Sequence, residues 1–193
     1  MKSILVPTDF SDYAPKAFEL AATIATQTKA PITLLHITGH DTETDGDAEI
    51  EKQKATLRQK LEAIKEKATG NIIINTQVVN GSIVPSILDA ITTYAADMVI
   101  MGTKGASGLK KVVMGSNTAN IIGKASVPVL SIPTGYTNAG VKQIALAINE
   151  TDDLQNLAPL FELAAALQAQ VRLAIFTGEK DDAATYITDR RAI

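Results

Sequence analysis

Three glycines and a serine stand in this 193-residue chain at a spacing that suits the binding of phosphate groups. In the pattern G-x2-G-x9-G-S they are Gly102, Gly105, Gly115 and Ser116. The pattern follows the apolar run 98–101 and precedes a segment of helical period, and α/β folds build phosphate sites from this order of strand end, glycine loop and helix start. Glycines let the backbone approach an anion, and the first amides of a helix are unpaired donors. Asn117 and Thr118 add side-chain donors in the same turn, so we predict an anion-binding loop.

Each member of this pattern can also serve a purely structural purpose when taken alone. A glycine can serve only to make a turn, and Ser116 can serve only to cap a helix. The joint spacing favours the phosphate site. Two other phosphate motifs do not fit. Gly123-Lys124 lacks the Ser or Thr that must follow it and a glycine five positions earlier, which excludes a P-loop. The glycines also lack the G-x-G-x-x-G spacing, which disfavours a nicotinamide cofactor.

The elements that must carry this loop follow from the hydrophobic pattern. Short apolar runs alternate with longer segments of helical period, which predicts an α/β fold in three layers with a parallel sheet between helices. Strands are expected at residues 4–6, 32–37, 72–79, 98–101 and 127–132. Ser11 is placed to cap the first helix, and the second ends near Gly70. The third is expected over 81–95 and the fourth over about 116–124.

Composition and charge exclude several classes of protein. Eighteen basic and twenty-one acidic residues leave a net charge of -3, which offers no electrostatic footprint for a nucleic acid. The absence of cysteine excludes disulfide scaffolds, cysteine nucleophiles and thiolate metal sites. The chain has neither a run of eighteen apolar residues nor a signal-peptide pattern. We therefore expect a soluble cytoplasmic protein with no membrane partner.

Beyond a linker at residues 135–140 the sequence begins again. The residues Phe-Glu-Leu-Ala-Ala at 18–22 return unchanged at 161–165. An internal repeat accounts for this most simply. It predicts a complete domain at residues 1–134 and a partial second copy at 141–193, made of strand, helix, strand and a tail helix after Asp181.

The partial copy is too small to bury a core of its own. We therefore expect its strands, at residues 144–148 and 171–176, to dock against the first domain or a second chain. Phe161, Leu163 and Leu167 are expected to face inward.

On these motifs the chain resembles the ATP-binding subgroup of the universal stress protein family. The glycine pattern, the start Ile-Leu-Val-Pro-Thr-Asp at 4–9 and the end Pro-Val-Leu-Ser-Ile-Pro at 128–133 all match the family's marks, and the likeness covers residues 1 to about 133. The resemblance implies a Rossmann-like fold whose five parallel strands lie in the order 3-2-1-4-5, with ATP across the carboxyl ends of strands one and four. The reversal of strand order there independently favours a ligand. The repeat resembles tandem members of the family with an incomplete second domain.

The resemblance also implies a set of nucleotide-binding residues. Carried over position by position, they are Pro7, Thr8, Asp9, Ile37, Met101, Gly102, Gly105, Gly115, Ser116, Asn117 and Thr118. Thr8 and Asp9 after the first strand and Ile37 at the end of the second would line the adenosine end, and Met101 and Gly102 would lie beneath the ribose and phosphates. The phosphates would be held by Gly105, Gly115, Ser116, Asn117 and Thr118, and Mg²⁺ would arrive with them. Lys104 and Ala106 depart from the family, which often has His and a basic residue there, and are expected to weaken triphosphate affinity without abolishing the site.

Three further polar residues near these elements are candidates for a role in the chemistry, and two of them also suit structural roles. Asp9 is placed to favour the positive end of the first helix, and this role is compatible with an adenosine contact. His36 stands between apolar strand neighbours, which indicates a packed or edge histidine rather than a general base. His40 has no metal-binding partner at a recognisable spacing. We assign catalysis to neither histidine.

The resemblance suggests a nucleotide-dependent regulatory protein of the stress response that is at most a slow ATPase, because nothing resembles a water-activating base beside a Mg²⁺ ligand set. Two alternatives stay open: an authentic ATPase or phosphotransferase, and an interaction or structural module with a vestigial site. Relatives pair through strand five, so a homodimer is expected through the edge from Val127 to Ile132. The second copy has Asn149 at the position of Asp9 and no glycine pattern, so we do not expect it to bind ATP.

Overall fold

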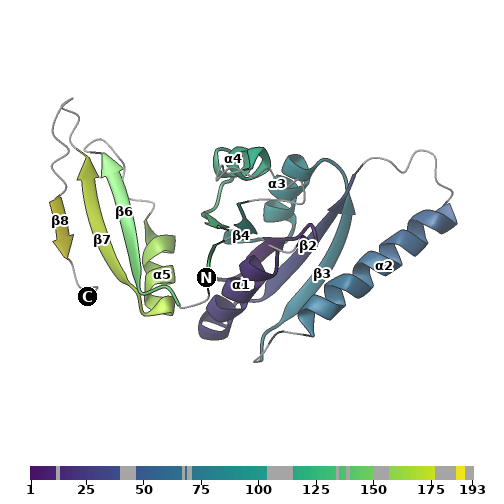
Figure 1. Cartoon of the computed structure of the whole chain (residues 1–193), viewed down its shortest axis with the longest axis horizontal. Coiled ribbons are helices and arrows are strands. Elements are labelled where there is room, and N and C mark those ends of the chain that lie inside the picture. Colours follow the sequence, from purple (N-terminus) through teal and green to yellow (C-terminus); the bar gives the residue numbers. More distant parts are fainter. Residues whose placement is uncertain are drawn as a thin grey trace. The chain divides into compact units, whose positions relative to one another are not determined.

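The computed structural model of the chain describes residues 1–11, 14–39, 47–66, 68, 71–103, 115–133, 135–137, 140–149, 157–176 and 186–189. The chain divides into two compact units, Met1–Asn138 and Ala139–Ile193. We call them unit 1 and unit 2, and each has its own sheet (Figure 1). Within the residues given above, no helix combines the length and the apolar composition needed to cross a membrane.

Unit 1 contains a five-stranded parallel sheet. Its strands are β1 Ile4–Pro7, β2 Ile32–Thr38, β3 Ile74–Asn80, β4 Met98–Gly102 and β5 Val129–Ile132, in the order β3-β2-β1-β4-β5. Each neighbouring pair runs parallel. The α/β class and the strand order expected from the sequence are confirmed, and the order reverses between β1 and β4.

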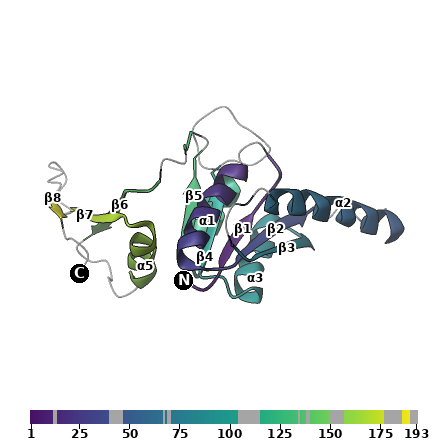
Figure 2. The same ribbon diagram turned by 90° about the horizontal axis from the view of Figure 1, so that it is seen from below.

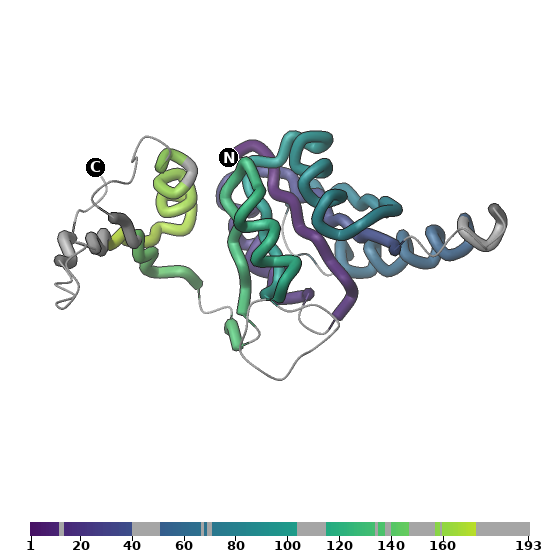
Figure 3. The backbone as a smooth tube through the Cα atoms, turned by 90° about the horizontal axis from the view of Figure 1, so that it is seen from above, coloured from purple at the N-terminus to yellow at the C-terminus, as the bar shows by residue number. Residues whose placement is uncertain are grey.

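Helices cover both faces of this sheet. They are α1 Ala14–Thr28, α2 Asp47–Lys65, α3 Ile83–Thr93 and α4 Ser116–Ile122. Helices α1 and α2 lie on one face and α3 on the other (Figure 2), and α4 lies beside α3 (Figure 3). Leu5, Leu35 and Val99 point to the second face, where they form one core cluster with Ile87 of α3 and Ile121 of α4. The sheet is therefore the middle of three layers.

The two central strands are apolar along their length. Ile4 and Leu5 of β1 and Val99 and Ile100 of β4 have no exposed surface, as expected for parallel strands covered on both faces. The carboxyl ends of parallel strands meet at the same edge of a sheet. Two fully packed strands therefore hold the residues that follow β1 and β4 close together at that edge.

Some predicted ends of elements move. β5 begins at Val129, because Pro128 has no N–H to donate to the ladder. α3 ends at Thr93 and not at Ala95, because Ala95 has a left-handed φ of 47° that does not continue a helix. α4 ends at Ile122, with Gly123 as its C-cap.

The predicted side-chain cap of α1 is wrong for Ser11. Its hydroxyl oxygen is buried and has no hydrogen-bond partner in the described part of the chain. Its carbonyl oxygen instead accepts the N–H of Ala14 at 3.1 Å. The main-chain carbonyl of Ser11, and not its hydroxyl, therefore bonds to the start of α1. The sequence pattern shows that a serine is present but not which of these two groups makes the bond.

Unit 2 contains β6 Gln143–Asn149, α5 Ala158–Leu167, β7 Gln170–Phe176 and β8 Tyr186–Asp189. β6 and β7 pair in parallel around α5, and β8 pairs antiparallel with β7. The strand, helix and strand expected here are present. The expected tail helix does not extend over 186–189, which form β8. Tyr, Ile and Thr favour strands, and β7 offers them an edge to pair with.

The inward orientation expected of Phe161 is also wrong. Its exposed fraction in unit 2 is 49%, whereas Leu163 and Ala164 are 6% and 3% exposed. Successive residues of a helix differ by about 100°, so Phe161 and Leu163 lie about 200° apart around the helix axis, and both are buried only where neighbouring elements cover opposite sides of the helix. Helix α5 contacts β7 of the unit 2 sheet.

Candidate functional site

A cavity opens at the carboxyl ends of β1 and β4, where the strand order reverses. Its volume is about 170 Å³, well above the roughly 10 to 15 Å³ that one water molecule requires. The lining residues are Pro7, Thr8, Asp9, Ala14, Leu35, Ile37, Ile83, Ile87, Met101, Gly102, Gly115, Ser116, Asn117 and Thr118. They come from three strands of the sheet, from the loop after β1, and from the N-terminal parts of three helices. The described side chains therefore leave room for a ligand at the carboxyl ends of β1 and β4, where α/β folds bind their ligands.

The structure brings together ten of the eleven residues expected from the sequence, all of them in this lining. The remaining one, Gly105, lies in the segment 104–114, outside the described residues. Their proximity is established, and their contacts with a ligand stay a prediction.

Sequence reasoning missed four lining residues, Ala14, Leu35, Ile83 and Ile87. Three of them carried a usable signal. Leu35 stands two residues before Ile37 on the same strand, so both point to one face. Ile83 and Ile87 are four residues apart at the start of a helix and so share a stripe. The apolar wall of the cavity could have been found from these spacings.

The loop after β1 is shaped by its own side chains. The Thr8 N–H donates to the Leu35 carbonyl at 2.8 Å, which extends the sheet pattern past the strand. The Phe10 N–H then donates to the Thr8 hydroxyl oxygen at 3.2 Å, and the Ser11 N–H donates to Asp9 Oδ1 at 3.0 Å. Side-chain acceptors of this kind fix tight turns. The Asp9 carboxylate therefore orders the chain before α1 and also lines the cavity.

The start of α4 forms the opposite wall. Gly115 is the N-cap, and Ser116 is the first helical residue. The Gly115 N–H donates to the Thr103 carbonyl at 2.8 Å, and a Cβ at position 115 would lie 3.2 Å from that same oxygen. A side chain there would push the two backbone segments apart. The amides of the first helical turn have no partner within the helix, and Ser116 and Asn117 line the cavity.

Thr118 differs from its predicted role as a side-chain donor to phosphate. It is only 3% exposed, and its hydroxyl donates to the Gly102 carbonyl at 3.1 Å. This bond joins α4 to the end of β4. The hydroxyl hydrogen of Thr118 is thus used inside the protein, whereas Ser116 and Asn117 are more accessible.

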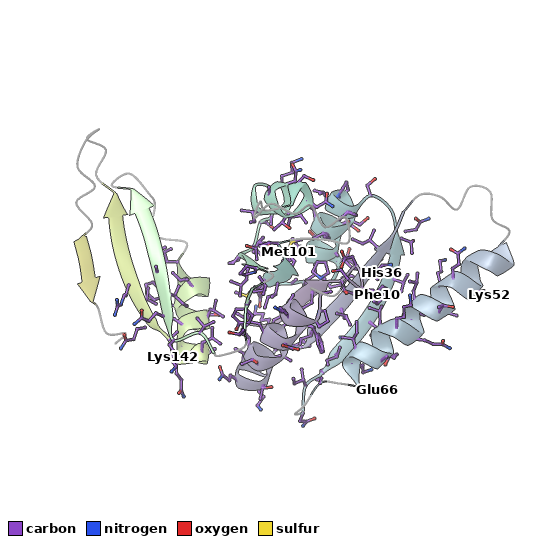
Figure 4. All side chains as sticks on the ribbon, viewed as in Figure 1. Phe10, His36, Lys52, Glu66, Met101 and Lys142 are labelled. Atoms are coloured by element: carbon purple, nitrogen blue, oxygen red, sulfur yellow. The ribbon has the colours of Figure 1, made fainter. Side chains whose placement is uncertain are left out.

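The floor of the cavity is apolar. Leu35, Ile87 and Met101 are buried beneath it, and Met101 stands at the end of β4 (Figure 4). Ile83 is 47% exposed at the start of α3. An exposed isoleucine beside a buried apolar floor offers a surface for a flat, weakly polar group.

Asp9 is the one ionisable side chain in the described lining. In the parts of the chain that the structure describes, no group of three or more His, Asp or Glu side chains could hold a metal ion. The cavity therefore combines an apolar floor, one carboxylate and a set of helix-start amides. This combination suits a ligand with an apolar ring at one end and an anionic group at the other.

Comparison with known proteins assigns the part of the chain that carries the cavity to a protein family. Residues 1–133 match the model described as the universal stress protein family. The universal stress protein MJ0531 of Methanocaldococcus jannaschii is 28% identical over 138 residues, which cover 68% of this chain and 81% of that protein.

Solved structures agree in fold. That of MJ0577 from the same organism is 28% identical, with a TM-score of 0.63, and covers 70% of this chain and 98% of its own. A universal stress protein in complex with cAMP is 24% identical (TM-score 0.54, 69% and 97% covered), and that of Archaeoglobus fulgidus in complex with dAMP is 22% identical (TM-score 0.52, 68% and 98% covered). The family match spans more than half of the chain, and this chain therefore belongs to the universal stress protein family.

Proposed function

We propose that unit 1 binds an adenine nucleotide, ATP in the first place, in the cavity between β1 and β4, and that the chain acts as a nucleotide-dependent regulatory protein of the stress response. The observation that carries this proposal is the cavity itself. It unites an apolar floor and the backbone amides at the start of a helix, at the point where the strand order reverses. Neither half alone would select a nucleotide.

The proposed roles follow the two ends of the cavity. Thr8, Asp9 and Ile37 contact the adenosine, and Met101 lies beneath it. The amides of Ser116 and Asn117 hold the phosphates, with Gly105 from the glycine loop. Gly115, whose own N–H donates to the Thr103 carbonyl, fixes the start of the helix beside them. Charge-assisted hydrogen bonds to such amides contribute about 1.5 to 3 kcal/mol each. Mg²⁺ is carried by the phosphates and needs no dedicated protein ligands.

The ligands of two relatives support adenine as the base. cAMP and dAMP both contain adenine and a single phosphate group. A triphosphate would extend from that phosphate along the glycine loop. We therefore expect AMP, ADP and ATP to share one adenosine site and to differ in affinity through the loop.

We propose binding as the primary role and slow hydrolysis at most. Efficient phosphoryl transfer uses a positioned water and a Mg²⁺ ligand set, whereas the described lining offers the Asp9 carboxylate, which already accepts the Ser11 N–H. ATP turnover well above about one per minute, lost in a Gly115→Val variant, would instead establish an ATPase.

Isothermal titration of the purified chain with AMP, ADP and ATP plus Mg²⁺ tests the proposal. We expect one saturable site per chain, lost in Gly115→Val because a side chain at 115 meets the Thr103 carbonyl. Gly135→Val is the matched control, since a Cβ at position 135 meets nothing within 4 Å. Absence of saturation at millimolar nucleotide would contradict the proposal, as would equal binding by both variants.

We further propose a homodimer through β5, which is an edge strand of the unit 1 sheet. An unpaired strand edge readily accepts another strand. Light scattering at twice the chain mass is expected, and a monomer mass would contradict it.

A further inference from the structure

A histidine on the far face of the sheet contacts the loop that forms one wall of the cavity. Leu35 and Ile37 of β2 line the cavity, and His36 between them points to the other face, because side chains alternate along a strand. The Nδ1 atom of His36 lies 2.8 Å from the carbonyl oxygen of Thr8. A carbonyl oxygen can only accept, so Nδ1 carries the hydrogen and donates it.

Phe10 extends this contact. Its ring centroid lies 4.4 Å from that of His36, and the two labelled side chains lie together in Figure 4. The Lys60 ammonium of α2 lies 5.4 Å from the centroid of the Phe10 ring, within range of a cation–π interaction. The Phe10 side chain is therefore held between a strand residue and a helix residue.

The backbone at Phe10 depends on such support. Its φ is 58°, in the left-handed region that bulky residues rarely adopt. Conformations of this kind cost free energy and persist only where surrounding contacts over-determine them. Here the contacts are those of His36 and Lys60 with the Phe10 ring and that of His36 with the Thr8 carbonyl.

The bend at Phe10 determines where the preceding residues point. Thr8 is tied to it by the hydrogen bond from the Phe10 N–H to the Thr8 hydroxyl oxygen, and Asp9 by the bond from the Ser11 N–H to its carboxylate. Both side chains line the cavity. A displacement of the Thr8 carbonyl would therefore move two residues of the cavity wall.

We propose that His36 is a positioning residue of the nucleotide site. Its Nδ1–H holds the Thr8 carbonyl on the side of the sheet away from the ligand, and its ring supports Phe10, so that Thr8 and Asp9 are in place before the nucleotide arrives. This inference rests on the proposed function for its ligand. Its structural content, that His36 fixes the loop, concerns the nucleotide-free protein as well.

The test compares His36→Leu with His36→Asn. The two replacements have nearly the same shape, but the asparagine amide nitrogen lies close to the position of Nδ1 and can donate to Thr8. We expect titration with AMP to show roughly fivefold to tenfold weaker binding in His36→Leu, as for the loss of one hydrogen bond, and recovery to within about twofold in His36→Asn. Thr38→Val is the control on the same face of β2, because the Thr38 hydroxyl donates to β3 and not to the loop.

Equal AMP affinity in all variants, or an equal loss in the leucine and asparagine variants, would overturn the proposal. Amide hydrogen exchange of Phe10 and Ser11 without nucleotide gives a second measurement, expected to be faster in His36→Leu and unchanged in His36→Asn. If the native chain binds no nucleotide, the proposed function fails, and this exchange still decides whether His36 fixes the loop. If His36→Leu does not fold, His36→Gln replaces it, since its longer side chain moves the amide away from the Nδ1 position.

Discussion

The same five residues have different surroundings in the two units. Phe-Glu-Leu-Ala-Ala occupies 18–22 in α1 and 161–165 in α5. In both helices the leucine and the following alanine are buried. Phe18, however, is 6% exposed, and Phe161 is 49% exposed. The same local sequence is therefore buried at the leucine and alanine in both helices, but its phenylalanine is buried only in α1.

The two helices also differ in the width of the sheet beneath them. α1 contacts β1, β2, β4 and β5 of the five-stranded sheet, whereas the main strand contact of α5 is with β7 of a three-stranded sheet. The comparison shows that the helix sequence sets which residues can be buried, and the sheet decides which of them are.

The largest effect is expected from replacing Phe18 by alanine, with the same change at Phe161 as its comparison. Phe18→Ala should lower the free energy of unfolding of unit 1 by about 3 to 5 kcal/mol, because it leaves a cavity under α1. Phe161→Ala should change stability by less than about 0.5 kcal/mol. Urea unfolding followed by circular dichroism measures both. Similar losses in the two variants would show that Phe161 is buried in solution.

A second comparison exchanges one residue between the units. Asp9→Asn gives unit 1 the residue that unit 2 has at Asn149, and should weaken adenine nucleotide binding by roughly tenfold, the effect of losing one charge-assisted hydrogen bond. The reverse change, Asn149→Asp, should leave one site per chain. Titration calorimetry gives both affinity and stoichiometry. Undiminished affinity in Asp9→Asn would remove this carboxylate from the site, and a second site in Asn149→Asp would show that unit 2 is a competent nucleotide domain.

Features of the fold and the site can be predicted from the sequence when they depend on residues close together in the chain, and not when they depend on residues far apart. The strands, their order and the edge that carries the cavity are predictable, because apolar runs and the glycine pattern are local signals joined by a strong family resemblance. The role of His36 is not, since its partner Thr8 is 28 residues away in sequence and the contact exists only once β1 and β2 pair.

Three further differences between expectation and structure have equally specific causes. The place of Thr118 beside Ser116 suggests a phosphate donor, but its hydroxyl is directed to Gly102, on a different element. Residues 186–189 form a strand because they pair with the edge of β7, and the sequence of those four residues does not reveal that this edge is available. The match with Phe18 suggests an inward Phe161, but the narrower sheet of unit 2 gives that side chain different surroundings.

A third test separates a buried from an exposed threonine. Thr118→Val should lower the free energy of unfolding by about 1 kcal/mol, because the Gly102 carbonyl loses its donor in a buried place. Thr56→Val makes the same change where the hydroxyl donates to the Lys52 carbonyl on the exposed face of α2, and should have almost no effect. Chemical unfolding of the two variants in parallel gives the difference. Equal values would mean that the bond between α4 and β4 adds nothing.

The smallest effect is expected at Glu62, which links α2 to β3. The hydroxyl of Thr76 donates to its carboxylate at 2.8 Å, and this bond, followed by the Lys65 ammonium, holds the pKa of Glu62 below its ordinary value of 4.5. A lowered pKa stabilises the folded state above the unfolded pKa, and that contribution is lost as the pH falls through the folded pKa. Glu62→Gln should therefore reduce the fall in stability below about pH 4.5. Urea midpoints across this range check it, and identical curves for the two proteins would contradict it.

The most direct test of the account is the electron density of crystals of the chain soaked with ATP and Mg²⁺. We expect the adenosine over Met101 and Ile37 and the phosphates at the amides of Ser116 and Asn117, with one nucleotide per chain and none in unit 2. Density in which the protein's own atoms fill the space between β1 and β4 at saturating nucleotide would contradict the account.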